Sequence, residues 1–167
     1  MNKIFIVLVM LSILFFMNCA IPQKYWPQQD VGVEQVGNQT ARNKILLFSS
    51  QSDFKDGLIN EIKSSIEEGD YFLKITGLES LKTENTEDYD KVIIIATCLS
   101  WGLEYSVQEF LDNYDNMDKV ILITTSGDGN WKPNKYERKI DAIATASKKV
   151  RIPKIVYEVR QIIEETK

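Results

Sequence analysis

The sequence predicts an α/β fold, a doubly wound parallel sheet of four to five strands with helices on both faces. Two observations carry this prediction. Short, wholly apolar runs such as residues 45–48 and 92–96 are typical of strands that are buried on both faces. These runs alternate with segments whose apolar residues recur at helical spacing. Such alternation indicates parallel strands joined by right-handed crossovers.

The strands and helices can be placed in order along the chain. Strands are predicted over residues 45–48, 71–75, 92–96 and 120–123. The first helix lies between the first two strands; its start is capped by Ser52 or Asp53, and Gly69 ends it. Its inner face is formed by four residues: Leu58, Ile59, Ile62 and Ile66.

The rest of the chain supplies two more helices and one ambiguous segment. Apolar residues between 103 and 114 predict a second helix, and Pro153 is a good first-turn residue for a last one. Residues 78–90 are polar, and they are too few and too weakly patterned to predict a helix. Residues 140–144 fit an edge strand or part of a helix, and their place just before the last helix favours the strand.

Composition excludes several kinds of site. The 167 residues suit one domain, and the net charge of −4 offers no footprint for nucleic acid. The absence of histidine removes His-based catalytic triads and the common zinc sites. The two cysteines, Cys19 and Cys98, cannot form a disulfide scaffold or a cysteine metal cluster, and no metal is expected. Cys98 is expected to be a small core residue.

The N-terminus reads as an export signal. Lys3 precedes fourteen almost purely apolar residues, 4–17, a run shorter than the roughly 20 residues of a membrane-spanning helix. Cys19 follows this run and resembles the acylated cysteine of a bacterial lipobox. The prediction is a signal peptide over 1–18, a lipidated cysteine and flexible tether over 19–43, and the folded domain over 44–167. The protein would then be lipid-anchored to a membrane of the bacterial cell envelope, on the extracytoplasmic side. An ordinary cleaved signal or an uncleaved anchor is the alternative.

Three polar loops follow predicted strands, at the edge of the sheet where α/β proteins bind ligands. The first loop is residues 50–55, the second 97–102 and the third 126–131. Together with the strands that precede them, these loops resemble the flavodoxin-like family of FMN-binding proteins. The resemblance covers about residues 44–166, and it implies a flavin held noncovalently by the three loops.

The resemblance assigns the phosphate to the first loop. Ser50 and Ser52 match two hydroxyl positions of the family's phosphate-binding turn. Asp53 stands where the family has a glycine, and Lys55 where it has a last hydroxyl. A carboxylate beside a phosphate weakens binding, whereas Lys55 would partly compensate.

The resemblance assigns the flavin ring to the other two loops. Residues Ser100, Trp101 and Gly102 lie where the family places an aromatic side chain that stacks on the ring. The third loop offers backbone amides and a second stacking face through four residues: Ser126, Gly127, Gly129 and Trp131. The alternative is structural, because two tryptophans can close the top of a small core and two glycines can simply permit a turn.

The implied function is noncovalent FMN binding and electron transfer. Net acidity would direct the domain towards a redox partner with a basic surface. The alternative is a flavodoxin-like lipoprotein that has no cofactor and serves as a binding or structural module. An FMN-dependent reductase stays open, although no general acid or base stands out.

Overall fold

The computed structural model describes residues 29–67, 69–136 and 139–165. They form one six-stranded sheet in the order β1-β3-β2-β4-β5-β6. The strands are β1 (Glu34–Gly37), β2 (Asn43–Ser49), β3 (Tyr71–Thr76), β4 (Lys91–Thr97), β5 (Val120–Ser126) and β6 (Asp141–Ala146). Five of these strands are parallel, and only β1 runs antiparallel to its neighbour β3. The sheet confirms the predicted α/β class and adds one strand at its edge.

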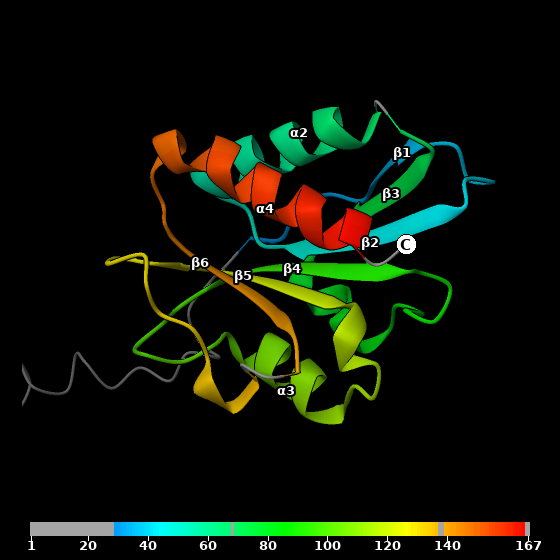
Figure 1. Ribbon diagram of the computed structural model, residues 1–167. Coiled ribbons are helices and arrows are strands. Elements are labelled where there is room, and N and C mark those ends of the chain that lie inside the picture. Colours follow the sequence, from blue (N-terminus) through cyan, green and yellow to red (C-terminus); the bar gives the residue numbers. More distant parts are fainter. Residues whose placement is uncertain (1–28, 68, 137–138, 166–167) are drawn as a thin grey trace, which may run out of the picture.

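Helices cover both faces of the sheet (Figure 1). One face carries α2 (Asp53–Glu67) and α4 (Ile152–Glu165), and the other carries α3 (Tyr105–Asn113). Short 3-10 turns complete the chain: η2 (Leu78–Lys82), η3 (Met117–Lys119), η4 (Asn134–Tyr136) and η5 (Lys149–Arg151). The chain therefore passes from β3 to β4 and from β5 to β6 without a full helix, so α3 is the one α-helix of its face among the described residues.

The core has two halves, one on each side of the sheet. Alternate residues of the buried strands point to opposite faces, so Ile93 and Ile95 pack under α2 and α4, whereas Ile94 packs under α3. Within the described part of the chain, the buried apolar residues lie between Ala41 and Ile163. Residues 20–167 thus contain the whole described core, and we expect this segment to fold by itself.

The expected tether contains a strand. Residues 34–37 pair with β3, and Val36 packs against the core under α2. The prediction of a flexible tether is wrong for this part, because an edge strand needs only one apolar residue facing the core and leaves no apolar run. Residues 1–28, which include the predicted signal peptide and Cys19, lie outside the described residues. No helix in the described residues is long and apolar enough to cross a membrane.

The ambiguous segment is a strand, as favoured. β6 pairs in parallel with β5 from Asp141 to Ala146 and forms the other edge of the sheet. Without β1, the strand order reads 2-1-3-4-5 in sequence numbering, an arrangement of doubly wound sheets.

Candidate functional site

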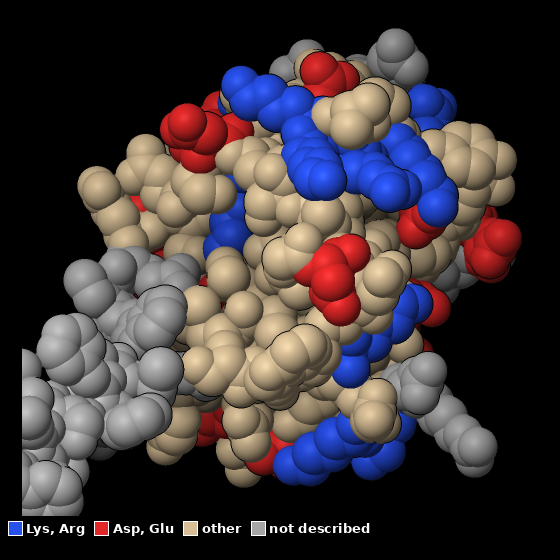
Figure 2. All heavy atoms as spheres, turned by 90° about the vertical axis from the view of Figure 1, so that its left-hand side faces the viewer, with Lys and Arg blue, Asp and Glu red and all other residues tan. Residues whose placement is uncertain are grey.

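The three loops meet at the carboxyl edge of the sheet, the edge that faces the viewer in Figure 2. The first loop follows β2 and the second follows β4, its immediate neighbour. The chain leaves β2 towards β3 but leaves β4 towards β5, on the other side, so the strand order reverses between them. Ligands of open α/β sheets bind at such a reversal. The structure therefore brings the three predicted loops to one edge.

The two serines of the first loop have different roles. Ser52 caps α2, because its hydroxyl accepts a hydrogen bond from the Lys55 N–H at 3.2 Å and its carbonyl accepts one from the Asp56 N–H at 2.8 Å. Ser50 is 1% exposed, and its hydroxyl accepts a hydrogen bond from Lys55 Nζ at 2.5 Å. Asp53 and Asp56 lie in the first turn, where carboxylates stabilise a helix N-terminus. The helix thus places its own negative charges where an anionic ligand would bind.

A buried ion pair ties the first loop to the chain after β4. Lys55 Nζ lies 3.7 Å from Glu104 Oε1, and the two side chains are 4% and 8% exposed. The same oxygen accepts a hydrogen bond from the Thr97 N–H at 2.7 Å. Burial lowers the pKa of Lys55 below its ordinary value, and Glu104 opposes this shift. Lys55, expected beside a ligand phosphate, is engaged in the interior, and its partner Glu104 belongs to no motif that the sequence revealed.

The segment before β1 covers part of the first loop. The Gln51 N–H donates to the Gln29 carbonyl at 2.6 Å, so this amide is not available to a ligand. Asp30 adds a carboxylate nearby, which accepts a hydrogen bond from the Glu79 N–H at 2.9 Å. Within the described part of the chain, no hydrogen bond uses the amides of residues 52–54. Three backbone donors at the start of α2 therefore remain for an anion.

The second loop holds a tight, strained turn. Leu99 and Gly102 exchange two backbone hydrogen bonds, of 2.9 and 3.0 Å. The two residues between them, Ser100 and Trp101, have φ values of 50° and 65°. This left-handed conformation is unfavourable for residues other than glycine, and most of all for bulky ones. The turn projects Trp101 outward, and the side chain is 77% exposed.

Cys98 precedes this turn and is only partly buried, so it is not the core residue that the sequence predicted. Its N–H donates to the Thr125 carbonyl at 2.8 Å, which continues the pairing of β4 with β5. Burial raises the pKa of the Cys98 thiol, and a hydrogen bond from the backbone of Trp101 opposes this. Because the thiolate is the nucleophile, the structure favours an unreactive thiol at neutral pH.

The third loop depends on one of its two glycines. Gly129 has a φ of 76°, and a Cβ there would lie 2.5 Å from the Ala146 nitrogen of β6. A Cβ on Gly127 would meet nothing within 4 Å. Asp128 accepts a hydrogen bond from the Ser126 hydroxyl at 2.7 Å, and this contact is the main cause of its lowered pKa. The loop is thus a closed, self-bonded turn rather than an open row of amides.

The two tryptophans differ in environment. Trp131 is half-buried and packs against the core cluster on the α3 face, and its carbonyl accepts a hydrogen bond from the Thr124 hydroxyl at 2.7 Å. This matches the structural alternative, a tryptophan that closes the core. Of these two tryptophans, Trp101 is the one with an exposed indole at the strand reversal.

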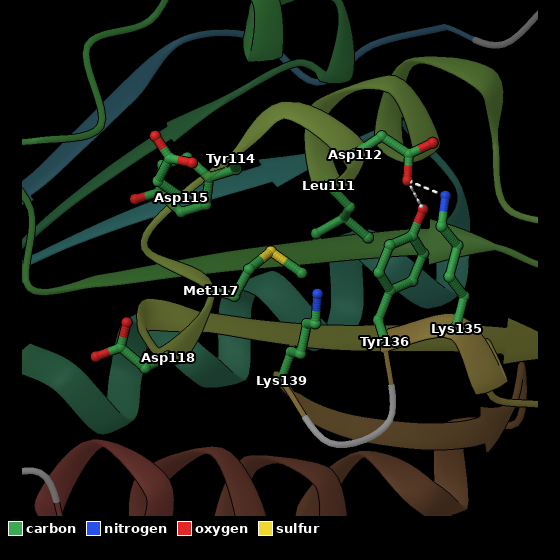
Figure 3. Close-up of a pocket in the computed structure, with 9 residues that line it drawn as sticks. All are labelled: Leu111, Asp112, Tyr114, Asp115, Met117, Asp118, Lys135, Tyr136 and Lys139. Atoms are coloured by element: carbon green, nitrogen blue, oxygen red, sulfur yellow. Dashed lines mark hydrogen bonds and ion pairs between the residues drawn. The ribbon is translucent and has the colours of Figure 1, made fainter.

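Cavities among the described residues also lie away from the strand reversal. A cleft of about 140 Å³ lies between the third loop, β6 and the start of α4, smaller than a pocket for a drug-sized ligand. A cavity of about 760 Å³ lies on the α3 face (Figure 3), where Asp112 accepts hydrogen bonds from Lys135 and from the Tyr136 hydroxyl. These contacts lower the pKa of Asp112, whereas burial and Asp112 raise that of Tyr136. The described residues hold no group of three metal ligands.

The fold is shared with a flavodoxin of known structure. The structure superposes on that of oxidised Flavodoxin 2 from Bacillus cereus with a TM-score of 0.57 at 15% identity, over 75% of this chain and 99% of that one. The chain has a flavodoxin-like fold. A second match, an oxidoreductase from Corynebacterium diphtheriae, has a TM-score of 0.47 at 12% identity and covers 75% of this chain and 99% of that one. No family model and no curated protein matches the sequence. The flavodoxin-like fold predicted from the loops is thus confirmed, and flavin binding stays a prediction.

Proposed function

We propose that this chain is a lipid-anchored, extracytoplasmic protein that binds a flavin noncovalently at its carboxyl edge and transfers electrons. Trp101 carries the proposal. Its indole is 77% exposed on a turn that is strained at two successive residues, at the strand reversal of a flavodoxin-like fold. Strained turns persist where the surrounding structure or a function requires them. An exposed indole at this place gives a flat ring a stacking surface.

The two ends of a flavin mononucleotide fit this edge unequally. Trp101 suits the ring, and three amides at the start of α2 suit a phosphate. The carboxylates of Asp53 and Asp56 oppose a phosphate, and Lys55 is buried in its pair with Glu104. The ring therefore contributes more to the proposed binding than the phosphate, and riboflavin should bind nearly as well as FMN.

A bound flavin would supply the electron-transfer chemistry, and the chain's own residues would hold and tune it. Trp101 would stack on the ring and exclude water from one face. The pair of Lys55 with Glu104 would fix the first loop relative to the end of β4. Asp53 and Asp128 would disfavour negative charge on a reduced flavin through simple repulsion. A redox partner with a basic surface stays a prediction that rests on the net charge of −4.

Flavin titration tests the proposal. Adding FMN or riboflavin to residues 20–167 should quench flavin and tryptophan fluorescence. Trp101→Ala should weaken binding by about 1–3 kcal/mol through lost stacking and burial. Tyr157→Ala is the control, because Tyr157 is 63% exposed on α4 and lies in none of the three loops. Equal flavin affinity of the Trp101→Ala variant and the wild type would place the ring elsewhere.

The anchor is tested separately. Cys19→Ser should release the exported protein from membranes or leave its signal uncleaved, and it should abolish labelling by a radioactive fatty acid. Cys98→Ser is the matched control, because Cys98 lies inside the folded domain. A wild-type chain that takes up no label would overturn lipidation.

A cofactor-free binding module is the second candidate. The bond from Gln51 to Gln29 and the acidic first turn of α2 favour it, because both reduce the capacity of the first loop for a phosphate. If neither flavin binds at millimolar concentration, this second candidate replaces the first.

A further inference from the structure

We propose that the carboxyl edge of this domain rests on the surface of a bilayer that contains anionic phospholipids. Three features of that edge support the proposal independently. They are a cluster of cations, the place where the chain enters the domain, and an exposed apolar side chain among the cations.

The cations gather around the start of α4, at the top of the edge in Figure 2. Lys148, Lys149 and Arg151 are exposed and form no ion pair within the described residues. Lys154 lies close by in sequence and forms an ion pair with Glu158, with 3.5 Å between Nζ and Oε1. Such a cluster on a chain of net charge −4 is a local excess, and clusters of Lys and Arg near a membrane bind anionic headgroups.

The chain enters the domain at the same edge. Gln29, the first described residue, bonds to Gln51 just beyond the carboxyl end of β2. β4 and β5 separate β2 from β6, so the entry point and the end of β6 are about 15 Å apart at ordinary strand spacing. Ten positions separate Cys19 from Gln29, a reach of at most about 35 Å. A lipid on Cys19 would therefore keep the carboxyl edge within about 35 Å of the bilayer.

An apolar side chain stands among these cations. Val150, between Lys149 and Arg151, is 81% exposed. The carboxylates of Asp128 and Glu158 line the same cleft as Arg151 and Lys154 and reduce the positive charge there, whereas Lys148 and Lys149 lie outside that cleft. If the proposed flavin function holds, the electron donor or acceptor then lies in or on the membrane.

Vesicle co-sedimentation of residues 20–167 tests the proposal without the lipid. The domain should bind vesicles of phosphatidylcholine with about one third phosphatidylglycerol and should not bind pure phosphatidylcholine. Binding should decline with salt, because the screening length falls from about 10 Å at 0.1 M to about 3 Å at 1 M. Replacing Lys148, Lys149 and Arg151 by Gln should weaken partitioning about a hundredfold, or roughly fivefold for each cation.

A control variant removes the same number of positive charges from the opposite edge of the sheet. Arg42, Lys44 and Lys139 lie at or just before the amino ends of β2 and β6, and their triple replacement by Gln should leave vesicle binding unchanged. Equal loss in the two triple variants, or no binding of the wild type to anionic vesicles, would overturn the proposal. Flavin affinity is measured on the same samples and should not change in either variant. A failure of flavin binding alone would contradict the proposed function and leave the membrane surface intact.

Discussion

Replacing Glu104 by Gln should destabilise the domain strongly, because it leaves the buried ammonium of Lys55 without its counter-charge. At the observed 3.7 Å, two unit charges attract by about 4 kcal/mol at an effective dielectric constant of 20. Removing one partner of a buried pair costs about 3–5 kcal/mol. We expect a loss of about 3 kcal/mol, because the amide oxygen of the glutamine can still accept the hydrogen bond from Thr97.

The loss of unfolding free energy in the Glu104→Gln variant should depend on pH in a defined direction. Burial already lowers the pKa of Lys55, and without Glu104 it should fall further. Below the folded-state pKa the full loss is present. As pH rises through that pKa towards the unfolded value of about 10.4, the unfolded chain keeps a proton that the native protein has released, so stability rises. The difference in unfolding free energy between the variant and the wild type should therefore become smaller as pH increases.

Urea unfolding of residues 20–167 at neutral pH and at about pH 10 measures both effects. Glu164→Gln is the control, because Glu164 forms an exposed pair with Arg160 at 3.0 Å, and such pairs contribute about 0.3–0.5 kcal/mol. A Glu104→Gln variant as stable as the control, with no dependence on pH, would show that Lys55 reaches solvent and would refute the reasoning.

Two further predictions concern the first and third loops. Gly129→Ala should lower the free energy of unfolding by about 1–3 kcal/mol, because its φ of 76° and the nearby nitrogen of Ala146 leave no room for a Cβ. Gly127→Ala, where the space is open, should be close to neutral in the same urea experiment. Asp53→Gly should tighten FMN binding by about 1 kcal/mol through relief of like-charge repulsion, less so at high salt. Titration with riboflavin, which has no phosphate, should show little change, and an equal gain for both flavins would contradict the electrostatic cause.

The buried strands were predictable because burial on both faces leaves a direct record in sequence. β4 consists mainly of consecutive aliphatic residues, and the run at 92–96 located it to within one residue at each end. β1 left no such record, because three of its four residues are exposed and Val36 alone packs on the core. Its position is set by pairing with β3, and no local pattern in residues 34–37 predicts that pairing.

The site was predictable in place but not in detail. Parallel strands bring their carboxyl ends to one edge, so the loops could be assigned before their geometry was known. The buried ion pair of Lys55 could not be predicted, because a lysine in the first turn of a helix is usually solvated and its partner Glu104 lies 49 positions away. The turn at Trp101 was equally hidden, since local preference opposes positive φ at Ser100 and at Trp101.

The charged groups of the carboxyl edge near α2 are therefore stabilised within the domain, whereas those near the start of α4 face solvent. The ammonium of Lys55 is neutralised by Glu104, and the first turn of α2 is stabilised by Asp53 and Asp56. An anion gains little from the part of the edge where a phosphate would sit in a flavin complex. Lys148, Lys149 and Arg151, which form no ion pair within the described residues, lie instead beyond β6, on the other side of the strand reversal. Because attraction for anions is strongest there, an anionic surface should contact the domain beside the proposed ring site, and its contact should not require the phosphate of a flavin.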